Sequence, residues 1–83
     1  MALENIKAAG KVIAGMRQTV KAIENDTALE VYIARDAEDK VTLPVIRLCQ
    51  EKGIPIVYAE TMTELGKACN IKVGAAMAAI LKD

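Results

Sequence analysis

Basic and amide side chains gather in one short segment, residues 15–23, which reads Gly-Met-Arg-Gln-Thr-Val-Lys-Ala-Ile. At helical spacing Arg17 and Lys21 lie one turn apart on the same face, and Gln18 lies beside them near the helix start. The first turn of a helix has backbone N–H groups without intrahelical partners and carries partial positive charge. These groups together form a set of hydrogen-bond donors that suits phosphates and base edges.

The opposite face of the same segment is apolar, because Met16, Val20 and Ile23 fall on it at helical spacing. The apolar residues 12–14 predict a short strand before it, and Gly15 stands at the turn into the helix. A simpler interpretation is that the basic face is only a solvated helix surface. Composition alone leaves both interpretations open.

The net charge is zero, with 11 basic and 11 acidic residues, but the charges are segregated along the chain. Residues 7–21 carry four basic residues and no acid, and residues 65–82 carry three and no acid. Residues 24–39 between them carry six acids and one arginine. If the fold brings the two basic segments together, one side of a neutral protein attracts phosphate, and binding should then require a specific site.

Length and composition predict one folded domain, residues 1–83, because 53% of the side chains are hydrophobic. The longest apolar run, residues 74–81, is far shorter than the ~20 residues of a membrane span. The amino-terminal residues lack the pattern of a signal peptide, so we expect a cytoplasmic protein. Cys49 and Cys69 are far apart and the chain has no histidine, so we expect no metal and no cofactor, and a free buried thiol at Cys49.

Catalytic residues are scarce in this chain. Glu38 and Asp39 are paired acids, but at a predicted helix start such acids more often complement the helix dipole. Gly10 and Gly15 fit neither the dinucleotide-binding nor the P-loop spacing. We therefore expect that the protein is not an enzyme.

The hydrophobic pattern predicts helices and strands in strict alternation, starting with a helix. A polar break, residues 25–27, follows the second predicted helix, and Gly53 and Asn70 are residue types that end helices in the left-handed conformation. The first two predicted helices are residues 3–9 and residues 16 to 24 or 25. The third ends at Lys52 and has Asp39 or Thr42 as its N-cap, and the fourth covers residues 64–70 with Thr61 or Thr63 as its N-cap. The predicted strands are 12–14, 29–34, 54–58 and 75–81.

This order predicts an α/β protein, a three-layer α/β/α sandwich with a four-stranded mixed sheet. The last strand is almost entirely apolar and is therefore expected in the interior of the sheet. In the strand 29–34 the apolar residues alternate, so Leu29, Val31 and Ile33 should point to one side.

The segment Ile71-Lys72-Val73 lies between the last helix and the last strand, with two branched apolar residues around a lysine. Such a segment is most often the start of a strand whose apolar side chains are both buried. The alternative is an apolar prong on the surface that packs on unstacked bases.

Three blocks of the chain closely resemble the ribosomal protein L7Ae family, above all its small bacterial members. They are residues 15–22 (GMRQTVKA), 43–55 (LPVIRLCQEKGIP) and 64–71 (ELGKACNI), in the same order and at matching separations. The resemblance covers nearly the whole chain. It implies an α/β/α sandwich that binds a kink-turn, which is a sharply bent RNA duplex with a short bulge next to tandem sheared G·A pairs.

The resemblance also implies which residues contact RNA. In the family, a Gly-x-Asn-Glu stretch at the helix start reads the exposed edges of the G·A guanines. Gly15 and Met16 occupy its first two positions here, Arg17 stands at the Asn position and Gln18 at the Glu position. The family lysine that follows is matched by Lys21.

The family loop that covers the flipped bulge bases is matched by Ile71, Lys72 and Val73. Two residues depart from the family pattern. Gln18 keeps a carbonyl acceptor without the charge of a carboxylate, so each hydrogen bond should be weaker. Arg17 is a long cation that can reach phosphate or a guanine edge. We expect kink-turn recognition to be retained, with altered selectivity between kink-turns.

The leading hypothesis is a monomeric, non-enzymatic protein that stabilises kink-turn RNA, in the ribosome or in another structured RNA, without DNA or membrane partners. The rival is a protein-interaction module that docks through the acidic segment 24–39. A small enzyme or anion-binding protein that uses Gly15 is a third interpretation.

Overall fold

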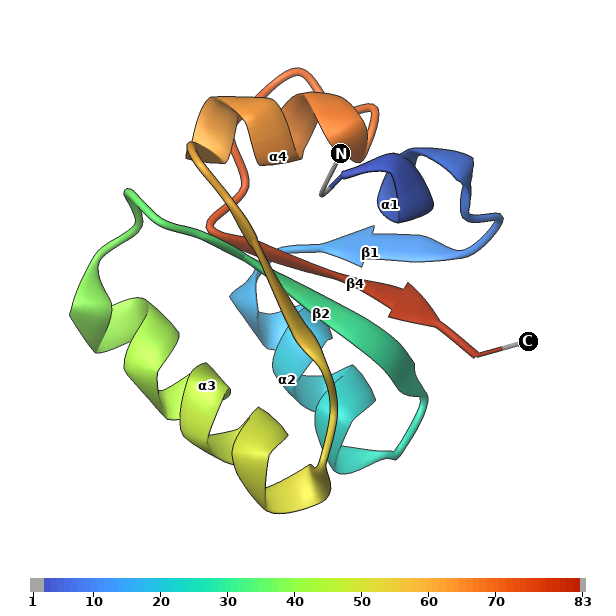
Figure 1. The fold of residues 1–83 in the computed structure, drawn as a ribbon, viewed down its shortest axis with the longest axis vertical. Coiled ribbons are helices and arrows are strands. Elements are labelled where there is room, and N and C mark those ends of the chain that lie inside the picture. The colour runs from blue at the N-terminus through green and yellow to red at the C-terminus, as the bar shows by residue number, and fades with distance from the viewer. Residues whose placement is uncertain (1–2, 83) are drawn as a thin grey trace.

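The computed structural model describes residues 3–82, in which helices and strands alternate as the hydrophobic pattern predicts (Figure 1). None of the helices within these residues is long and apolar enough to cross a membrane. The helices are α1 (Glu4–Ala8), α2 (Met16–Glu24), α3 (Asp39–Lys52) and α4 (Met62–Ala68). The strands are β1 (Val12–Ala14), β2 (Ala28–Ala34), β3 (Ile56–Ala59) and β4 (Met77–Leu81).

The four strands form one mixed sheet in the order β1-β4-β2-β3. β4 pairs antiparallel with both β1 and β2, and β2 pairs parallel with β3. The parallel pair requires a long crossover, which α3 supplies. The prediction that the apolar last strand lies in the interior of the sheet is confirmed.

Helices cover both faces of the sheet, as Figure 1 shows. Two separate core clusters are buried, one on each face. This arrangement confirms the three-layer α/β/α sandwich. Between the sheet and the pair α1 and α4, the core includes Ile6, Tyr32 and Leu65. Between the sheet and the pair α2 and α3, it includes Ile23, Val31 and Val45.

The alternation expected in β2 is wrong at Leu29, whose side chain is 54% exposed. The register between β2 and β4 shifts between Ala28 and Glu30, so Leu29 lies in a β-bulge. A bulged residue has no partner opposite it and breaks the period of two. After the bulge, residues 31–34 are all buried, because β2 is an interior strand with helices over both faces.

The start of α3 differs from the prediction. The helix begins at Asp39 and its N-cap is Glu38, without a side-chain capping bond, so the N-cap predicted at Asp39 or Thr42 is wrong. Pro44 consequently lies in the second turn of α3, where it has no N–H to donate to the carbonyl of Lys40. The helix end is as predicted, since Gly53 has φ +70° and caps it in the left-handed conformation.

Helix α4 leads into the loop before β4, and its ends are fixed locally. The Oγ1 of Thr61 accepts a hydrogen bond from the backbone N–H of Glu64 at 3.0 Å, which confirms Thr61 as the N-cap. Asn70, with φ +62°, stops the helical path as predicted. The last two strands start later than expected, at Ile56 and Met77.

Tyr32 makes the stability of the fold sensitive to alkaline pH. Its side chain is fully buried and its hydroxyl donates a hydrogen bond to the Glu30 carboxylate. Burial, this hydrogen bond and the charge of Glu30 raise the pKa of Tyr32 well above the usual value of about 10. The unfolded chain therefore loses the Tyr32 proton at a lower pH than the folded protein does. The contribution of Tyr32 to the free energy of unfolding is fully present below about pH 10 and decreases above it.

We expect Tyr32 to ionise only as the protein unfolds. The variant Tyr58→Phe leaves Tyr32 as the only tyrosine of the chain, so tyrosinate absorbance then reports one side chain. In an alkaline titration, the rise in absorbance should coincide with the loss of helical circular dichroism. A rise that precedes unfolding would show that the Tyr32 hydroxyl ionises within the folded protein.

Candidate nucleic-acid interface

Gly15 fixes the amino end of α2 to the sheet. Its φ of +107° lies in the region that only glycine adopts readily, and it turns the chain directly from β1 into α2. Its N–H donates to the carbonyl of Met77, the first residue of β4, at 3.0 Å. Its own carbonyl accepts the N–H of Thr19 at 3.1 Å. The start of α2 and the start of β4 are therefore held against each other.

The first two turns of α2 present the predicted polar side chains to solvent. Arg17, Gln18 and Lys21 are all exposed, and in residues 3–82 neither of the two cations forms an ion pair. No side chain caps the helix start, so the backbone N–H groups of the first turn remain open to a ligand. This end of α2 can donate hydrogen bonds and attract negative charge at the same point.

The opposite side of α2 forms its contact with the core. Ile23 and Thr19 are completely buried, whereas Met16 at the helix start is 41% exposed and extends the accessible surface. The Thr19 hydroxyl has no hydrogen-bond partner within the described residues. Burial therefore fixes which way the helix faces, and it leaves the basic face outward.

The segment Ile71-Lys72-Val73 is an exposed loop and not the start of a strand. The side chain of Val73 is 71% exposed and that of Ile71 is 37% exposed, so the interpretation with both apolar residues buried is wrong. Lys72 between them is also exposed. Ile71 and Val73 thus form an apolar prong on the surface, which is the alternative interpretation of this segment.

The loop is anchored along α4 at both of its ends. The N–H of Ile71 donates to the carbonyl of Gly66 at 3.1 Å, and the N–H of Ala75 donates to the carbonyl of Met62 at 3.0 Å. The chain therefore runs back over α4 from its carboxyl end to its amino end (Figure 1). The N–H of Met62 in turn donates to Oδ1 of Asp36 at 2.8 Å, which ties α4 to the turn after β2.

The start of α2 and the loop before β4 are both connected to the same end of the sheet. β4 is antiparallel to β1 and β2, so it starts where those strands end, with Ala78 opposite Ala14 and Met77 opposite Ile33. The amino end of α2 and the end of the loop consequently leave the sheet at this same edge (Figure 1). At this end of the sheet α2 begins with Gly15, Met16, Arg17 and Gln18, and Lys21 follows one turn further along the helix. The loop that contains Ile71, Lys72 and Val73 enters β4 at the same end.

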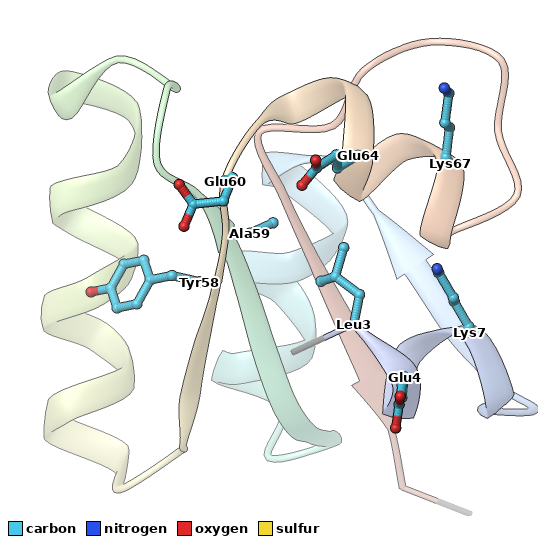
Figure 2. A pocket seen from close by; sticks show the side chains of 8 residues that line it. All are labelled: Leu3, Glu4, Lys7, Tyr58, Ala59, Glu60, Glu64 and Lys67. Carbon is cyan, nitrogen blue, oxygen red and sulfur yellow. The ribbon is translucent and has the colours of Figure 1, made fainter. Parts of the chain in front are cut away.

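A separate hollow of about 460 Å³ lies between α1, α4 and the end of β3. Figure 2 shows Lys7 and Lys67 on one side of it and Glu60 and Glu64 on the other. The two basic segments of the sequence do meet here, but carboxylates line the same hollow. It therefore has no dominant sign of charge, and the expected basic side is interrupted at this point.

The two cysteines are free thiols. Cys49 is completely buried, as predicted, and burial raises its pKa and also that of Cys69. A thiol with a raised pKa stays protonated at neutral pH and is a poor nucleophile and metal ligand. Within residues 3–82 no group of three His, Cys, Asp or Glu side chains could hold a metal ion.

Sequence reasoning missed the residues that hold the loop in place. Asp36 was one acid within an acidic segment, and nothing in its local sequence indicates that it binds the amino end of α4. Gly66 did carry a signal, because a glycine inside a helix is less favourable than alanine and usually has a packing reason.

Bacterial proteins are similar to this chain over most of its length. A protein named "RNA-binding protein" from Bacillus pumilus is 43% identical over 81 residues, covering 98% of this chain and 99% of its own length. A protein from Caldanaerobacter subterraneus, also named as RNA-binding, is 52% identical over 69 residues, covering 83% and 84% of the two chains.

Solved structures show the same fold. The 15.5kD RNA binding protein of Giardia lamblia superposes with a TM-score of 0.85 at 28% identity, over 99% of this chain and 69% of that one. The profile of the Ribosomal protein L7Ae/L30e/S12e/Gadd45 family matches residues 1–83. With the whole chain matched and bacterial relatives above 40% identity, this protein belongs to the Ribosomal protein L7Ae/L30e/S12e/Gadd45 family.

Proposed function

We propose that this protein binds kink-turn RNA as a monomer, without catalysing a reaction, and stabilises the bent form of that RNA. The observation that carries the proposal is the exposed set Arg17, Gln18 and Lys21 at an uncapped helix end that is bonded to the start of β4. The names of the bacterial relatives and of the Giardia protein support RNA as the partner.

The geometry of the helix end favours a distorted RNA over a regular duplex. The major groove of A-form RNA is too deep and narrow for side chains to read, so proteins read RNA at bulges and other irregular sites. A kink opens the groove and exposes base edges. Arg17 and Lys21 then supply charge for phosphates or a guanine edge, and the Gln18 amide supplies one acceptor and two donors.

The loop supplies a different kind of contact. Val73 is a branched apolar side chain that is 71% exposed next to the exposed Lys72, an arrangement that leaves hydrophobic surface in water. An unstacked bulge base also exposes apolar surface to water. Contact between this base and the Val73 side chain removes both apolar surfaces from water. Because both contacts require the bent RNA, binding shifts the RNA equilibrium toward the bent state by the difference in affinity.

The rival function, docking of a protein through the acidic segment 24–39, has little support in the fold. Asp26 forms an ion pair with Lys52 at 3.1 Å, and Asp36 is engaged by the N–H of Met62. Glu30 is half-buried on β2, where it accepts the hydrogen bond of Tyr32. Three of the six acids of this segment are therefore engaged with different parts of the fold, which leaves fewer free carboxylates for a protein partner.

A gel-shift titration tests the proposal directly. One RNA carries a standard kink-turn, and a matched RNA has the two G·A pairs replaced by Watson–Crick pairs. We expect a shift at low protein concentration with the first RNA and an affinity lower by at least tenfold with the second, because the exposed guanine edges are lost. Equal affinity for the two RNAs, or binding to neither, would reject kink-turn recognition.

A further inference from the structure

Gly66 occupies an interior position of α4, where alanine would favour the helix more. The residue is buried and packs directly against the loop. A Cβ atom added at Gly66 would lie 2.1 Å from the carbonyl oxygen of Val73 and 3.1 Å from the Cα of Gly74. Both neighbours are backbone atoms, so no side-chain rotation can relieve the contact.

The loop has no freedom to move away without breaking its anchors. On one side of the contact, the N–H of Ile71 bonds to the carbonyl of the same Gly66. On the other side, the N–H of Ala75 bonds to the carbonyl of Met62, and Gly74 packs so closely that an added Cβ would lie 3.2 Å from the Met62 Cβ. Residues 71–75 therefore pack closely on α4, and this close packing is possible because Gly66 has no side chain.

We propose that Gly66 is a positioning residue that sets how far the Ile71–Val73 loop stands above α4, and so determines whether Val73 can cover an unstacked RNA base. This inference rests on the proposed RNA-binding function for its consequence, but not for the placement of the loop. Gly66 itself touches no RNA in this arrangement, because it is buried beneath the loop.

The consequence for binding is tested with a double-mutant cycle on kink-turn RNA. We expect Val73→Ala to weaken binding by about tenfold through lost apolar contact, and Gly66→Ala to weaken it by about the same factor. The double variant should bind no worse than either single variant, because a displaced loop no longer uses Val73. Lys21→Ala should still have its full effect in the Gly66→Ala background, since α2 is unaffected.

Gly10→Ala is the matched control, because no atom lies within 4 Å of a Cβ added there. It should leave RNA affinity unchanged. Independent losses from Gly66→Ala and Val73→Ala in the double variant would overturn the proposal, as would full affinity of Gly66→Ala. A general loss of folded protein would give such independent losses, so the cycle separates positioning from instability.

Hydrogen exchange gives a readout that does not depend on RNA. In Gly66→Ala the amides of Ile71 and Ala75 should exchange faster than in the wild type, while the amide of Thr19 in α2 keeps its protection. Unchanged protection of the two loop amides would overturn the proposal even if the protein binds RNA. If Gly66→Ala loses protection at these amides and the wild-type protein does not bind kink-turn RNA, the role of Gly66 in positioning the loop is supported. Only the proposed RNA-binding function is then rejected.

Discussion

Replacing Arg17 by glutamate should lower the affinity for a kink-turn RNA by about 100-fold or more. A bidentate contact to a base edge contributes about 1–3 kcal/mol, and a carboxylate facing phosphates adds repulsion to the lost contact. The substitution should not unfold the protein, because an acidic residue in the first turn of a helix interacts favourably with the helix dipole. The loss would therefore report on the site itself, measured by fluorescence anisotropy at fixed salt concentration.

Arg47→Glu is the matched control for this reversal. Arg47 is also an exposed helical arginine without an ion pair in the described structure, but it lies in the middle of α3. Both variants change the net charge from zero to about −2, so long-range repulsion of RNA is the same. We expect Arg47→Glu to weaken binding by about threefold at most. Equal losses from both variants would mean that RNA responds to overall charge and that Arg17 contacts no specific group.

The order of elements and their place in the sheet could be predicted because local rules decide them. The apolar run at residues 75–81 is expected in an interior strand, and the strand that it forms, β4, lies between β1 and β2. Gly53 and Asn70 stop helices through their own left-handed conformation, which does not depend on the rest of the fold. The helical period likewise separates Arg17 from Ile23, and the structure places the first in solvent and the second in the core.

The remaining features depend on contacts between distant residues. Leu29 is exposed because two strands are out of register by one residue, which no pattern within β2 can indicate. Whether Val73 is buried or exposed depends on how its loop packs on Gly66 and Met62, so the sequence left both outcomes open. The exposed side chains of α2 and the buried Ile23 beneath them were predictable from the helical period, whereas the contacts that place the loop on Gly66 and Met62 were not.

Ile23 is the largest fully buried side chain of α2, so its truncation should strongly lower the stability of the fold. Ile23 is completely buried between α2, α3 and the sheet. Ile23→Ala should cost about 2–5 kcal/mol of the unfolding free energy, because the lost apolar burial is combined with an unfilled cavity. A domain of this size has about 4–12 kcal/mol in total, so the melting temperature should fall by at least ~10 °C.

Two further variants show whether burial is the cause. Leu29→Ala removes a side chain of equal volume that is 54% exposed, and it should cost less than about 1 kcal/mol. Ile23→Val should fall between the two, at about 0.5–1.5 kcal/mol. Similar losses for Ile23→Ala and Leu29→Ala in thermal or urea denaturation would show that the side chain of Ile23 is not the anchor of α2.

Kink-turn RNA should partly restore the melting temperature of Ile23→Ala, which connects this core position to the proposed site. A ligand that binds only the folded state stabilises it by about 2.7 kcal/mol at 100 times its Kd. If Ile23 contributes only to the stability of the folded state, the folded fraction of the variant still presents Arg17, Gln18 and Lys21 and is stabilised by RNA as much as the wild type. A smaller shift than in the wild type would mean that the truncated core also displaces the helix end, and that packing beneath α2 sets the geometry of RNA recognition.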